Sequence, residues 1–379
     1  MATRILSSLE QAPALFWDEA PRYPFLSRAF LGALEQTGAV GPGTGWSPHH
    51  LLLEAEGRPL ALLPLYRKSH SRGEYVFDHA WAEAYQRYGL RYYPKLLSAI
   101  PFTPVAGPRC LLAPGVTLAD CGPALLAAVK AETTALGASS WHGLFLPEDW
   151  QALCREQGLA LRSGCQFFWT DAAYGDFEGF LASFSSKRRK TLRRERRRVE
   201  EQGIRCRWLE GAEIDRATWD FFYTCYARTY ALRGQHPYLG QAFFEQLGQS
   251  MPEHLALVLA ESADGPLACA LFFKDADTLY GRYWGSTEDI DCLHFEVCYY
   301  QGIDYCLRQG LQRFDPGTQG EHKLTRGFSP TLTCSAHWMA EPAFQEAIQR
   351  FVQEEEDYVR RYQQDAKDYL PFRQSDAEQ

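Results

Sequence analysis

The sequence predicts an α/β protein built from two similar domains, each with a mixed β-sheet. At 379 residues the chain is longer than a single hydrophobic core usually serves, so two domains are expected. Hydrophobic residues make up 46% of the chain, which is ample for burial and argues against global disorder. The sequence also repeats itself in three short matches that follow one another in order, residues 23–34 with 236–247, 50–53 with 254–257, and 59–61 with 266–268.

Each copy of the repeat predicts the same succession of elements. A helix (25–36 and 238–249) precedes an apolar strand (51–56 and 255–261), and a turn containing glycine leads into a second strand (60–66 and 267–274). These two strands form a hairpin in each copy. The second copy continues with a strand at 278–284, a helix at 293–309 that ends at Gly310, and a strand at 312–315.

Between the copies, hydrophobic periodicity predicts helices 119–136, 148–157 and 177–184 and strands 140–145 and 160–170. Ser185 and Ser186 then cap a basic helix that ends at Gly203, and a strand follows at 204–208. An acidic, exposed helix is expected at about 342–365. The expected domains are 1–165, then 166–345 with the basic helix 187–202, and a C-terminal helix and tail, 346–379.

The basic helix carries an unusual charge. Nine of the twelve residues from Lys187 to Arg198 are basic, giving a charge of +8 in a chain whose net charge is −8. Like charges at this density repel one another along a helix, and folding does not require them. The helix therefore predicts binding of a polyanionic ligand; the alternative is a solvated basic face that only aids solubility.

The remaining composition bounds the class of protein. The eleven cysteines include no Cys-x-x-Cys pair, so neither a metal site nor a redox cofactor is expected. The N-terminal residues lack the apolar core of a secretory signal, and no stretch approaches the roughly 18 apolar residues of a membrane span. We therefore expect a cytoplasmic protein with reduced, buried thiols and no stable membrane insertion.

Several motifs, which span nearly the whole chain, resemble one family. They are residues 77–82 (FDHAWA), 92–96 (YYPKL) with 101–104 (PFTP), 293–296 (LHFE) with 298–300 (CYY), and 316–323 (PGTQGEHK) with 326–328 (RGF). The chain resembles Fem-type acyltransferases, whose best-known members transfer amino acids from aminoacyl-tRNA onto peptidoglycan precursors, and most closely the N-acyltransferases labelled peptidoglycan biosynthesis proteins. The resemblance implies two tandem domains of the GNAT-like acyl-CoA N-acyltransferase fold.

One segment departs from the pattern of acetyl-CoA-dependent members of this fold. They hold the pyrophosphate on a loop of the form Gln/Arg-x-x-Gly-x-Gly/Ala that opens the long helix of the domain. Here the corresponding residues, 285–291 (GSTEDID), are acidic and would repel a pyrophosphate, and residues 88–91 (YGLR) in the first copy match no better. The acidic segment therefore indicates that acetyl-CoA is not the donor.

Acyl transfer to an amine needs a base for the amine and hydrogen-bond donors where oxyanion charge develops. The candidate catalytic residues are Glu321 and His322, in a loop after a core strand, and His294 and Glu296, near the start of the long helix. His294 shares a helix face with Cys298, whereas Glu296 points away from both. The alternative for Glu296 is a structural role, in which it faces a core and pairs with Arg326. A surface loop with an ordinary charge cluster is the alternative for Glu321 and His322.

Further residues are candidates for substrate binding. Lys323 and Arg326 suit a phosphate or carboxylate. On the basic helix, Arg189 and Arg193 are i, i+4 neighbours, match two arginines of the Fem-type pattern, and would grip a diphosphate or a tRNA phosphate. In the first copy, substrate contacts are expected where the chain leaves a strand and in the motif that follows, at Asp78, His79, Trp81, Tyr93 and Lys95.

The sequence thus predicts an N-acyltransferase that moves an aminoacyl or acyl group to the amine of a peptide, an amino acid or a precursor resembling those of the cell wall. The favoured donor is aminoacyl-tRNA, a co-substrate and not a bound cofactor. Two alternatives stay open: an acyl-CoA-dependent N-acetyltransferase, and a non-catalytic twin domain that binds tRNA or another anionic ligand. The oligomeric state is left open.

Overall fold

The computed structural model describes residues 1–17, 23–318 and 320–373. The chain forms two compact units: unit 1 contains Met1–Gly164 and Leu332–Arg361, and unit 2 contains Cys165–Thr331 and the segment that starts at Tyr362. The first division lies next to the expected one after residue 165, whereas residues 332–345, expected in the second domain, belong to unit 1. Gln319 of the candidate loop and the end of the predicted tail lie outside the described residues.

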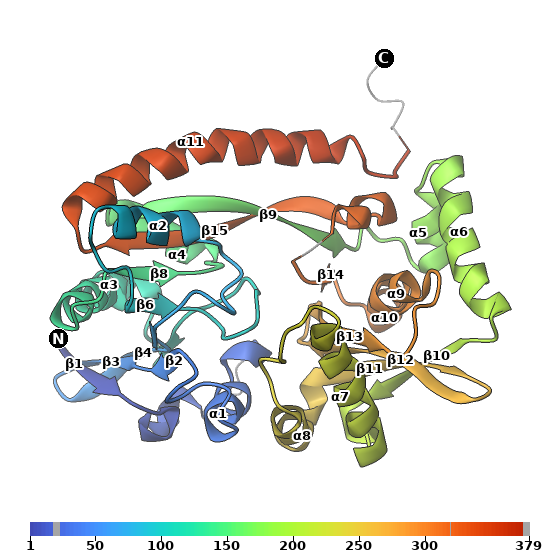
Figure 1. The fold of residues 1–379 in the computed structure, drawn as a ribbon, viewed down its shortest axis with the longest axis horizontal. Coiled ribbons are helices and arrows are strands. Elements are labelled where there is room, and N and C mark those ends of the chain that lie inside the picture. The colour runs from blue at the N-terminus through green and yellow to red at the C-terminus, as the bar shows by residue number, and fades with distance from the viewer. Residues whose placement is uncertain (18–22, 319, 374–379) are drawn as a thin grey trace. The chain divides into compact units, whose positions relative to one another are not determined.

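Unit 1 has two sheets, with strand orders β1-β3-β4-β7 and β15-β8-β6-β5-β2 (Figure 1). Its helices are α1 (Arg28–Gln36), α2 (His79–Arg87), α3 (Leu118–Ala135), α4 (Glu148–Glu156) and most of α11 (Pro342–Lys367). Its strands are β1 (Ala2–Leu6), β2 (Trp46–Pro48), β3 (His50–Ala55), β4 (Arg58–Leu63), β5 (Tyr66–Lys68), β6 (Lys95–Ser98), β7 (Leu111–Leu112), β8 (Ser140–Gly143), and parts of β9 (Ala160–Thr170) and β15 (Ser329–Met339).

Unit 2 has one sheet, in the strand order β10-β11-β12-β13-β14-β9 (Figure 1). Its strands are β10 (Arg205–Glu210), β11 (Leu255–Ser262), β12 (Gly265–Lys274), β13 (Thr278–Ser286), β14 (Arg313–Asp315) and the end of β9. Its helices are α5 (Phe177–Ala182), α6 (Ser186–Glu201), α7 (Arg216–Ala231), α8 (Gln241–Ser250), α9 (Leu293–Phe295) and α10 (Gln301–Gln309), with a π-helical turn at Glu296–Tyr300 and a 3₁₀ helix, η7, at Glu321–Arg326.

The repeat seen in the sequence is a repeat of structure. In unit 1 the hairpin β3–β4 pairs Glu54 with Pro59 directly after a β-bulge, and in unit 2 the hairpin β11–β12 pairs Glu261 with Pro266 directly after a β-bulge. Bulges are positional features that bend a strand at one point, so their recurrence in the same register supports the duplication. The predicted hairpins are confirmed in both copies.

Each unit packs buried apolar residues against its sheet. In unit 1, α3 and α4 contribute Leu125 and Trp150 to a core that includes Leu96 and Trp141 of the parallel strands β6 and β8. In unit 2, the core under α6 and α10 includes Leu192 and Ile303. Two parallel strands joined by a helix therefore stand at the centre of each unit, as the α/β prediction requires.

The two parallel pairs end differently. In unit 2, β13 pairs with β14 only from Thr278 to Tyr280, although β13 continues to Ser286, because the chain turns away after Asp315 at Pro316. The strands therefore diverge and leave a space. In unit 1 the buried Arg109 donates to the carbonyl oxygens of Leu144 and Phe145, which follow β8 directly, at 2.7 and 3.1 Å. The chain itself thus occupies that end of unit 1.

Two helices depart from the sequence prediction. Asp78, His79 and Trp81 do not leave a strand, since Asp78 precedes α2 and His79 begins it. The sequence prediction also omitted α7, which packs on β12 and β13, with the rings of Tyr226 and Tyr283 5.4 Å apart. A side chain on Gly285 of β13 would collide with the backbone of α7 at Cys225, so glycine permits this close approach.

Candidate functional site

A small cavity lies where β13 and β14 diverge in unit 2. Its volume is about 80 Å³, and its walls come from β12, β13, α9 and the π-helical turn. The lining residues are Ala270, Leu271, Phe272, Gly281, Arg282, Tyr283, Trp284, His294, Cys298, Tyr299 and Pro316. His294 and Cys298 both reach it, which confirms the predicted shared face of the helix. The cavity can enclose a small group with apolar surroundings and a few polar atoms.

Lys323 lies close to this cavity, on η7. It is fully buried, and its Nζ donates to the carbonyl oxygen of Gly317 at 2.5 Å. Burial lowers the pKa of Lys323 to about 8, which Asp315 opposes and Arg282 reinforces. At neutral pH the side chain is therefore mostly an ammonium group, and it forms no ion pair within the described residues. A buried ammonium with spare donors is suited to stabilising negative charge.

The neighbouring Arg282 and Asp315 form a buried pair. Arg282 donates to both carboxylate oxygens of Asp315, at 3.2 and 2.5 Å, and the backbone N–H of Gly317 donates to the same carboxylate at 2.9 Å. Asp315 ends β14 and Arg282 lies on β13, so the pair bridges the two strands at the point where they part. The pair also fixes the turn at Gly317, whose carbonyl oxygen accepts the hydrogen bond from Lys323.

Two histidines stand beside the cavity with aromatic neighbours. His322 Nε2 lies 2.9 Å from the hydroxyl of Tyr299, and the rings of His322 and His294 are 6.0 Å apart. Burial lowers the pKa of His294 to about 4 and, with help from Arg326, also lowers the pKa of His322. Both imidazoles are therefore neutral at pH 7. His322, which is exposed, is the better placed of the two to exchange protons with a substrate.

Gly320 allows His322 to adopt this position. Its φ is +106°, and a side chain at Gly320 would lie 2.1 Å from Cε1 of His322. Only glycine combines this backbone angle with so close an approach of the imidazole ring. Gly320, directly before Glu321, is therefore required for the observed position of His322.

Glu195 of α6 holds the loop and the helix together. It accepts two hydrogen bonds from Arg326, each 2.9 Å long, and a hydrogen bond from the hydroxyl of Tyr300. Arg326 also donates to the carbonyl oxygen of His322 at 2.8 Å, and its guanidinium lies 3.5 Å from the centre of the Phe295 ring. The single acidic residue inside the basic run thus positions the loop that carries His322 and Lys323.

The two predicted catalytic carboxylates are engaged elsewhere. Glu296 is buried, but its partner is Arg196 at 3.1 Å, together with Gln301, and not Arg326 as the core alternative supposed. Glu321 accepts a hydrogen bond of 2.7 Å from the hydroxyl of Tyr362 on the exposed side of its loop. Of the four candidate catalytic residues, His294 lines the cavity, His322 contacts the lining residue Tyr299, and both carboxylates have other partners.

The basic helix α6 packs through a narrow apolar stripe, since Leu192 and Val199, and Phe184 just before the helix, are buried. Its cations divide into two groups. Arg193, Arg196 and Arg198 are paired with Glu178, Glu296 and Asp291, respectively. Within the described residues no ion pair involves the others, which are Lys187, Arg188, Arg189, Lys190, Arg194 and Arg197. Arg189 is thus available to a ligand, and Arg193 is available by exchanging an exposed pair.

The first-copy candidates belong to a different environment in unit 1. Lys95 is fully buried, and its Nζ contacts Asp78, Glu74 at 2.7 Å and Ser71 at 2.8 Å, while Tyr93 reaches Ser71 from the other side at 2.8 Å. Burial lowers the pKa of Lys95, but the two carboxylates raise it by more. Lys95 and Asp78 therefore neutralise each other inside the unit.

The two remaining first-copy candidates differ in exposure. Trp81 is buried against His337, with ring centres 4.7 Å apart, whereas His79 is exposed beside Phe77. The hydrogen-bond network continues inward from Asp78 through Tyr92 to His142, whose Nδ1 lies 2.6 Å from Nδ1 of His337. These residues therefore belong to unit 1, where Asp78, Trp81 and Lys95 have packing partners of their own.

Sequence reasoning missed Glu195, Arg282, Asp315 and Tyr299. Glu195 carried a signal, as the one acid among nine basic residues, but its partner Arg326 is 131 residues away. Arg282 and Asp315 lie on predicted strands and gave no local signal. No group of three or more His, Cys, Asp or Glu side chains within residues 1–17, 23–318 and 320–373 is arranged to hold a metal ion.

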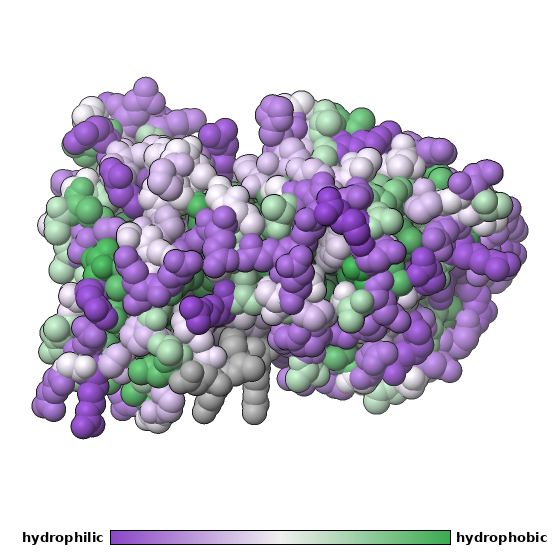
Figure 2. Space-filling model, turned by 90° about the horizontal axis from the view of Figure 1, so that it is seen from below, coloured by the Kyte–Doolittle hydropathy of each residue, from purple (hydrophilic) through white to green (hydrophobic). Residues whose placement is uncertain are grey.

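The surface in Figure 2 carries hydrophilic residues over most of the face shown, with hydrophobic residues in scattered patches. Within the described part of the chain, every helix is too short or too polar to span a bilayer.

The fold resembles several solved structures. FemX gives a TM-score of 0.53 at 12% identity, covering 92% of this chain and 100% of that chain. A protein of unknown function from Bacteroides thetaiotaomicron gives 0.52 at 10% identity (89% and 99% covered), and L-PGS from Bacillus licheniformis gives 0.50 at 12% identity (85% and 95% covered). The predicted α/β fold of two tandem GNAT-like domains is confirmed.

No curated protein sequence matches the chain significantly. A family model does: the FemAB_like model, described as peptidoglycan biosynthesis/recognition, matches residues 8–374. This match covers almost the whole chain, including both units and the loop with His322 and Lys323. The chain therefore belongs to the FemAB_like family.

Proposed function

We propose that unit 2 is an N-acyltransferase domain that moves an aminoacyl group from aminoacyl-tRNA to the amine of a peptide-like acceptor. The observation that carries the proposal is the cavity between β13 and β14 with the buried ammonium of Lys323 and the neutral imidazole of His322 beside it. Family membership supports a transferase of this general class. The acceptor class rests on the description of the family.

The residues divide the chemistry between them. The amine nitrogen forms a bond to the acyl carbon, and negative charge develops on the acyl oxygen, where the Lys323 ammonium donates. The ester bond between the acyl carbon and the oxygen of the donor then breaks, and this oxygen leaves as a hydroxyl group. His322 accepts the proton that the amine loses and returns it to that hydroxyl, through Nδ1 because Nε2 is bound to Tyr299.

The acyl group itself must be small. The cavity of about 80 Å³ has aromatic walls, among them Phe272, Tyr283 and Trp284. A short aminoacyl side chain fits such a space, whereas a long chain does not. Small size also suits the confinement of the reacting carbonyl near Lys323.

The charge around α9 favours a donor other than an acyl-CoA. The loop between β13 and α9 contains Glu288, Asp289 and Asp291, and only Asp291 has a cationic partner within the described residues, Arg198. Glu288 and Asp289 are exposed and would repel a pyrophosphate at this helix start. The unpaired cations of α6 offer a phosphate backbone an attractive surface on the same unit.

A donor comparison tests the proposal. Purified full-length protein is incubated with glycylglycine as the amine acceptor and with either ¹⁴C-alanyl-tRNA or ¹⁴C-acetyl-CoA, and acylated dipeptide is measured by mass spectrometry. We expect product from alanyl-tRNA and none from acetyl-CoA above the enzyme-free background. Product from acetyl-CoA alone would show that the donor is an acyl-CoA and not aminoacyl-tRNA. Binding of tRNA without product from either donor would show a non-catalytic binding protein.

The role of α6 is tested separately. The double variant Arg189→Ala/Arg193→Ala is expected to weaken tRNA binding and to flatten its dependence on salt, because each phosphate contact contributes about one unit to the slope of log K against log salt. The matched control is Arg205→Ala/Arg207→Ala on β10 of the same unit, which removes the same charge from outside the helix. Equal affinity of both double variants across the salt series would show that Arg189 and Arg193 act only through net charge and make no specific phosphate contact.

A further inference from the structure

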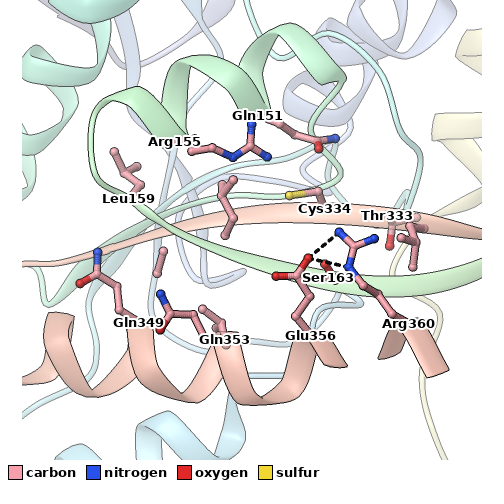
Figure 3. A pocket seen from close by; sticks show the side chains of 14 residues that line it. Gln151, Arg155, Leu159, Ser163, Thr333, Cys334, Gln349, Gln353, Glu356 and Arg360 are labelled. Carbon is pink, nitrogen blue, oxygen red and sulfur yellow. Dashed lines mark hydrogen bonds and ion pairs between the residues drawn. The ribbon is translucent and has the colours of Figure 1, made fainter. Parts of the chain in front are cut away.

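A second and larger cavity lies within unit 1, with a volume of about 460 Å³. Figure 3 shows side chains of α4 and α11 reaching it from opposite sides of β9 and β15. Most of the lining side chains are polar: Gln151, Arg155, Ser163, Thr333, Gln349, Gln353, Glu356 and Arg360. The volume falls in the range of ligand sites, about 300–1,000 Å³, and exceeds that of a single ordered water many times.

The charges of the lining leave one cation in excess. Arg360 donates to Glu356 one turn earlier on α11, at 2.6 Å, so these two charges balance. Arg155 of α4 forms no ion pair among residues 1–17, 23–318 and 320–373. It lies near enough to Cys334 to oppose, by its charge, the rise that burial imposes on the pKa of that thiol. The cavity therefore presents one uncompensated guanidinium.

The excess of one charge selects among anions. A carboxylate carries one negative charge, and its two oxygens match the parallel N–H groups of a guanidinium. A phosphate monoester carries a charge of about −1.5 to −2 at pH 7, more than one uncompensated guanidinium neutralises. The lining thus suits a monoanionic carboxylate better than a phosphate.

The glutamine side chains indicate which groups the ligand carries besides its carboxylate. Gln151 uses its Nε2 to donate to the carbonyl oxygen of Leu146 at 2.8 Å, and Gln349 uses its Nε2 to donate to the carbonyl oxygen of Gly158 at 3.0 Å. These bonds fix the orientation of both amides and leave each Oε1 as an acceptor. Acceptors on two sides and hydroxyls from Ser163 and Thr333 suit a ligand with several N–H groups.

We propose that this cavity of unit 1 binds a short peptide by its free C-terminal carboxylate, with Arg155 as the carboxylate-binding residue and the Gln151 and Gln349 oxygens as acceptors for peptide N–H groups. The site is separate from the residues proposed for acyl transfer in unit 2, so it stands or falls independently of that reaction. A dipeptide or tripeptide matches the volume, and no covalent step is involved.

The ligand class is tested by calorimetric titration of the full-length protein with triglycine, triglycine amide and inorganic phosphate. Triglycine amide has the same body but no carboxylate. We expect saturable binding of triglycine and at least about tenfold weaker binding of the amide, the size of a charge-assisted hydrogen bond. Equal binding of the two peptides, absence of saturable binding of triglycine, or tighter binding of phosphate would each overturn the proposal.

The residue assignment is tested with Arg155→Gln, which keeps hydrogen-bond capacity and removes the charge. Arg155 is exposed at the cavity, so this variant should fold, which a thermal melt checks. Binding of triglycine should weaken at least about tenfold in Arg155→Gln and stay at the wild-type level in Arg361→Gln, a matched change on α11 outside the cavity. Arg155→Lys, which keeps the charge without the fork, should bind at an intermediate level. Wild-type binding by Arg155→Gln would overturn the assignment.

Discussion

Replacing Lys323 by alanine is expected to lower the rate of acyl transfer by about 100- to 1000-fold, the usual effect of removing one donor to a developing oxyanion. Lys323 is buried beside the cavity, has no ion-pair partner within the described residues, and donates to a backbone carbonyl that a substrate oxygen can replace. The rate is measured as kcat for aminoacyl transfer with saturating donor. The exposed Lys367→Ala on α11 is the matched control and should leave kcat unchanged.

The pH profile separates a catalytic role of Lys323 from a structural one. The pKa of Lys323 is lowered to about 8, so the ammonium form is lost as pH rises through that value. Activity of the wild-type protein should therefore fall above pH 8, and this alkaline limb should be absent from the residual activity of Lys323→Ala. A wild-type rate that keeps rising beyond pH 9 would rule out a donor role for the ammonium group.

Replacing Lys95 by methionine is expected to destabilise unit 1 by about 3–5 kcal/mol, the cost of removing one partner from a buried ion pair. The change leaves the carboxylates of Glu74 and Asp78 buried without their main cation, although Lys68 stays 3.5 Å from Glu74. Burial raises the pKa of Asp78, but Lys95, His142 and Ser71 together lower it by more, so the carboxyl is ionised in the native protein. Urea unfolding followed by tryptophan fluorescence measures the effect.

Two comparisons make the result on Lys95 specific. Lys190→Met, at an exposed position of α6, should change the free energy of unfolding by no more than about 0.5 kcal/mol. The triple variant Lys95→Met/Glu74→Gln/Asp78→Asn removes all three charges and should recover part of the loss, because no uncompensated charge is then buried. If Lys95→Met unfolds at the same urea concentration as wild type, the buried network contributes nothing to stability.

Local patterns in the sequence predicted most elements of the fold. The strand 160–170 and the helix that ends at Gly310 occur as predicted, and the hairpins of both copies differ by a few residues at their ends. The short strands β5 and β6 escaped because three or four residues carry too little periodicity. The omission of α7 had no such reason, since Trp219, Phe222 and Tyr226 follow helical spacing.

The sequence indicated two stretches of candidate residues, and the structure places these stretches next to each other. The loop at 317–327 and the helix start at 293 do meet, and His294, His322 and Lys323 come together there. The carboxylates had been assigned by residue type alone, and residue type does not reveal whether a cation lies opposite. Arg196 meets Glu296, and Glu195 meets Arg326, only because α6 packs on the π-helical turn.

The sequence by itself determined the duplicated α/β layout and the family, because turns, caps, short motifs and hydrophobic periods are local properties of a few neighbouring residues. Tertiary structure alone decided which charged groups remain available. Lys95 and Lys323 are both buried lysines in quoted motifs, yet Lys95 faces two carboxylates and Lys323 faces a carbonyl oxygen near a cavity. The difference depends on partners at least six residues away, brought together by packing, and the availability of a charge follows from those partners.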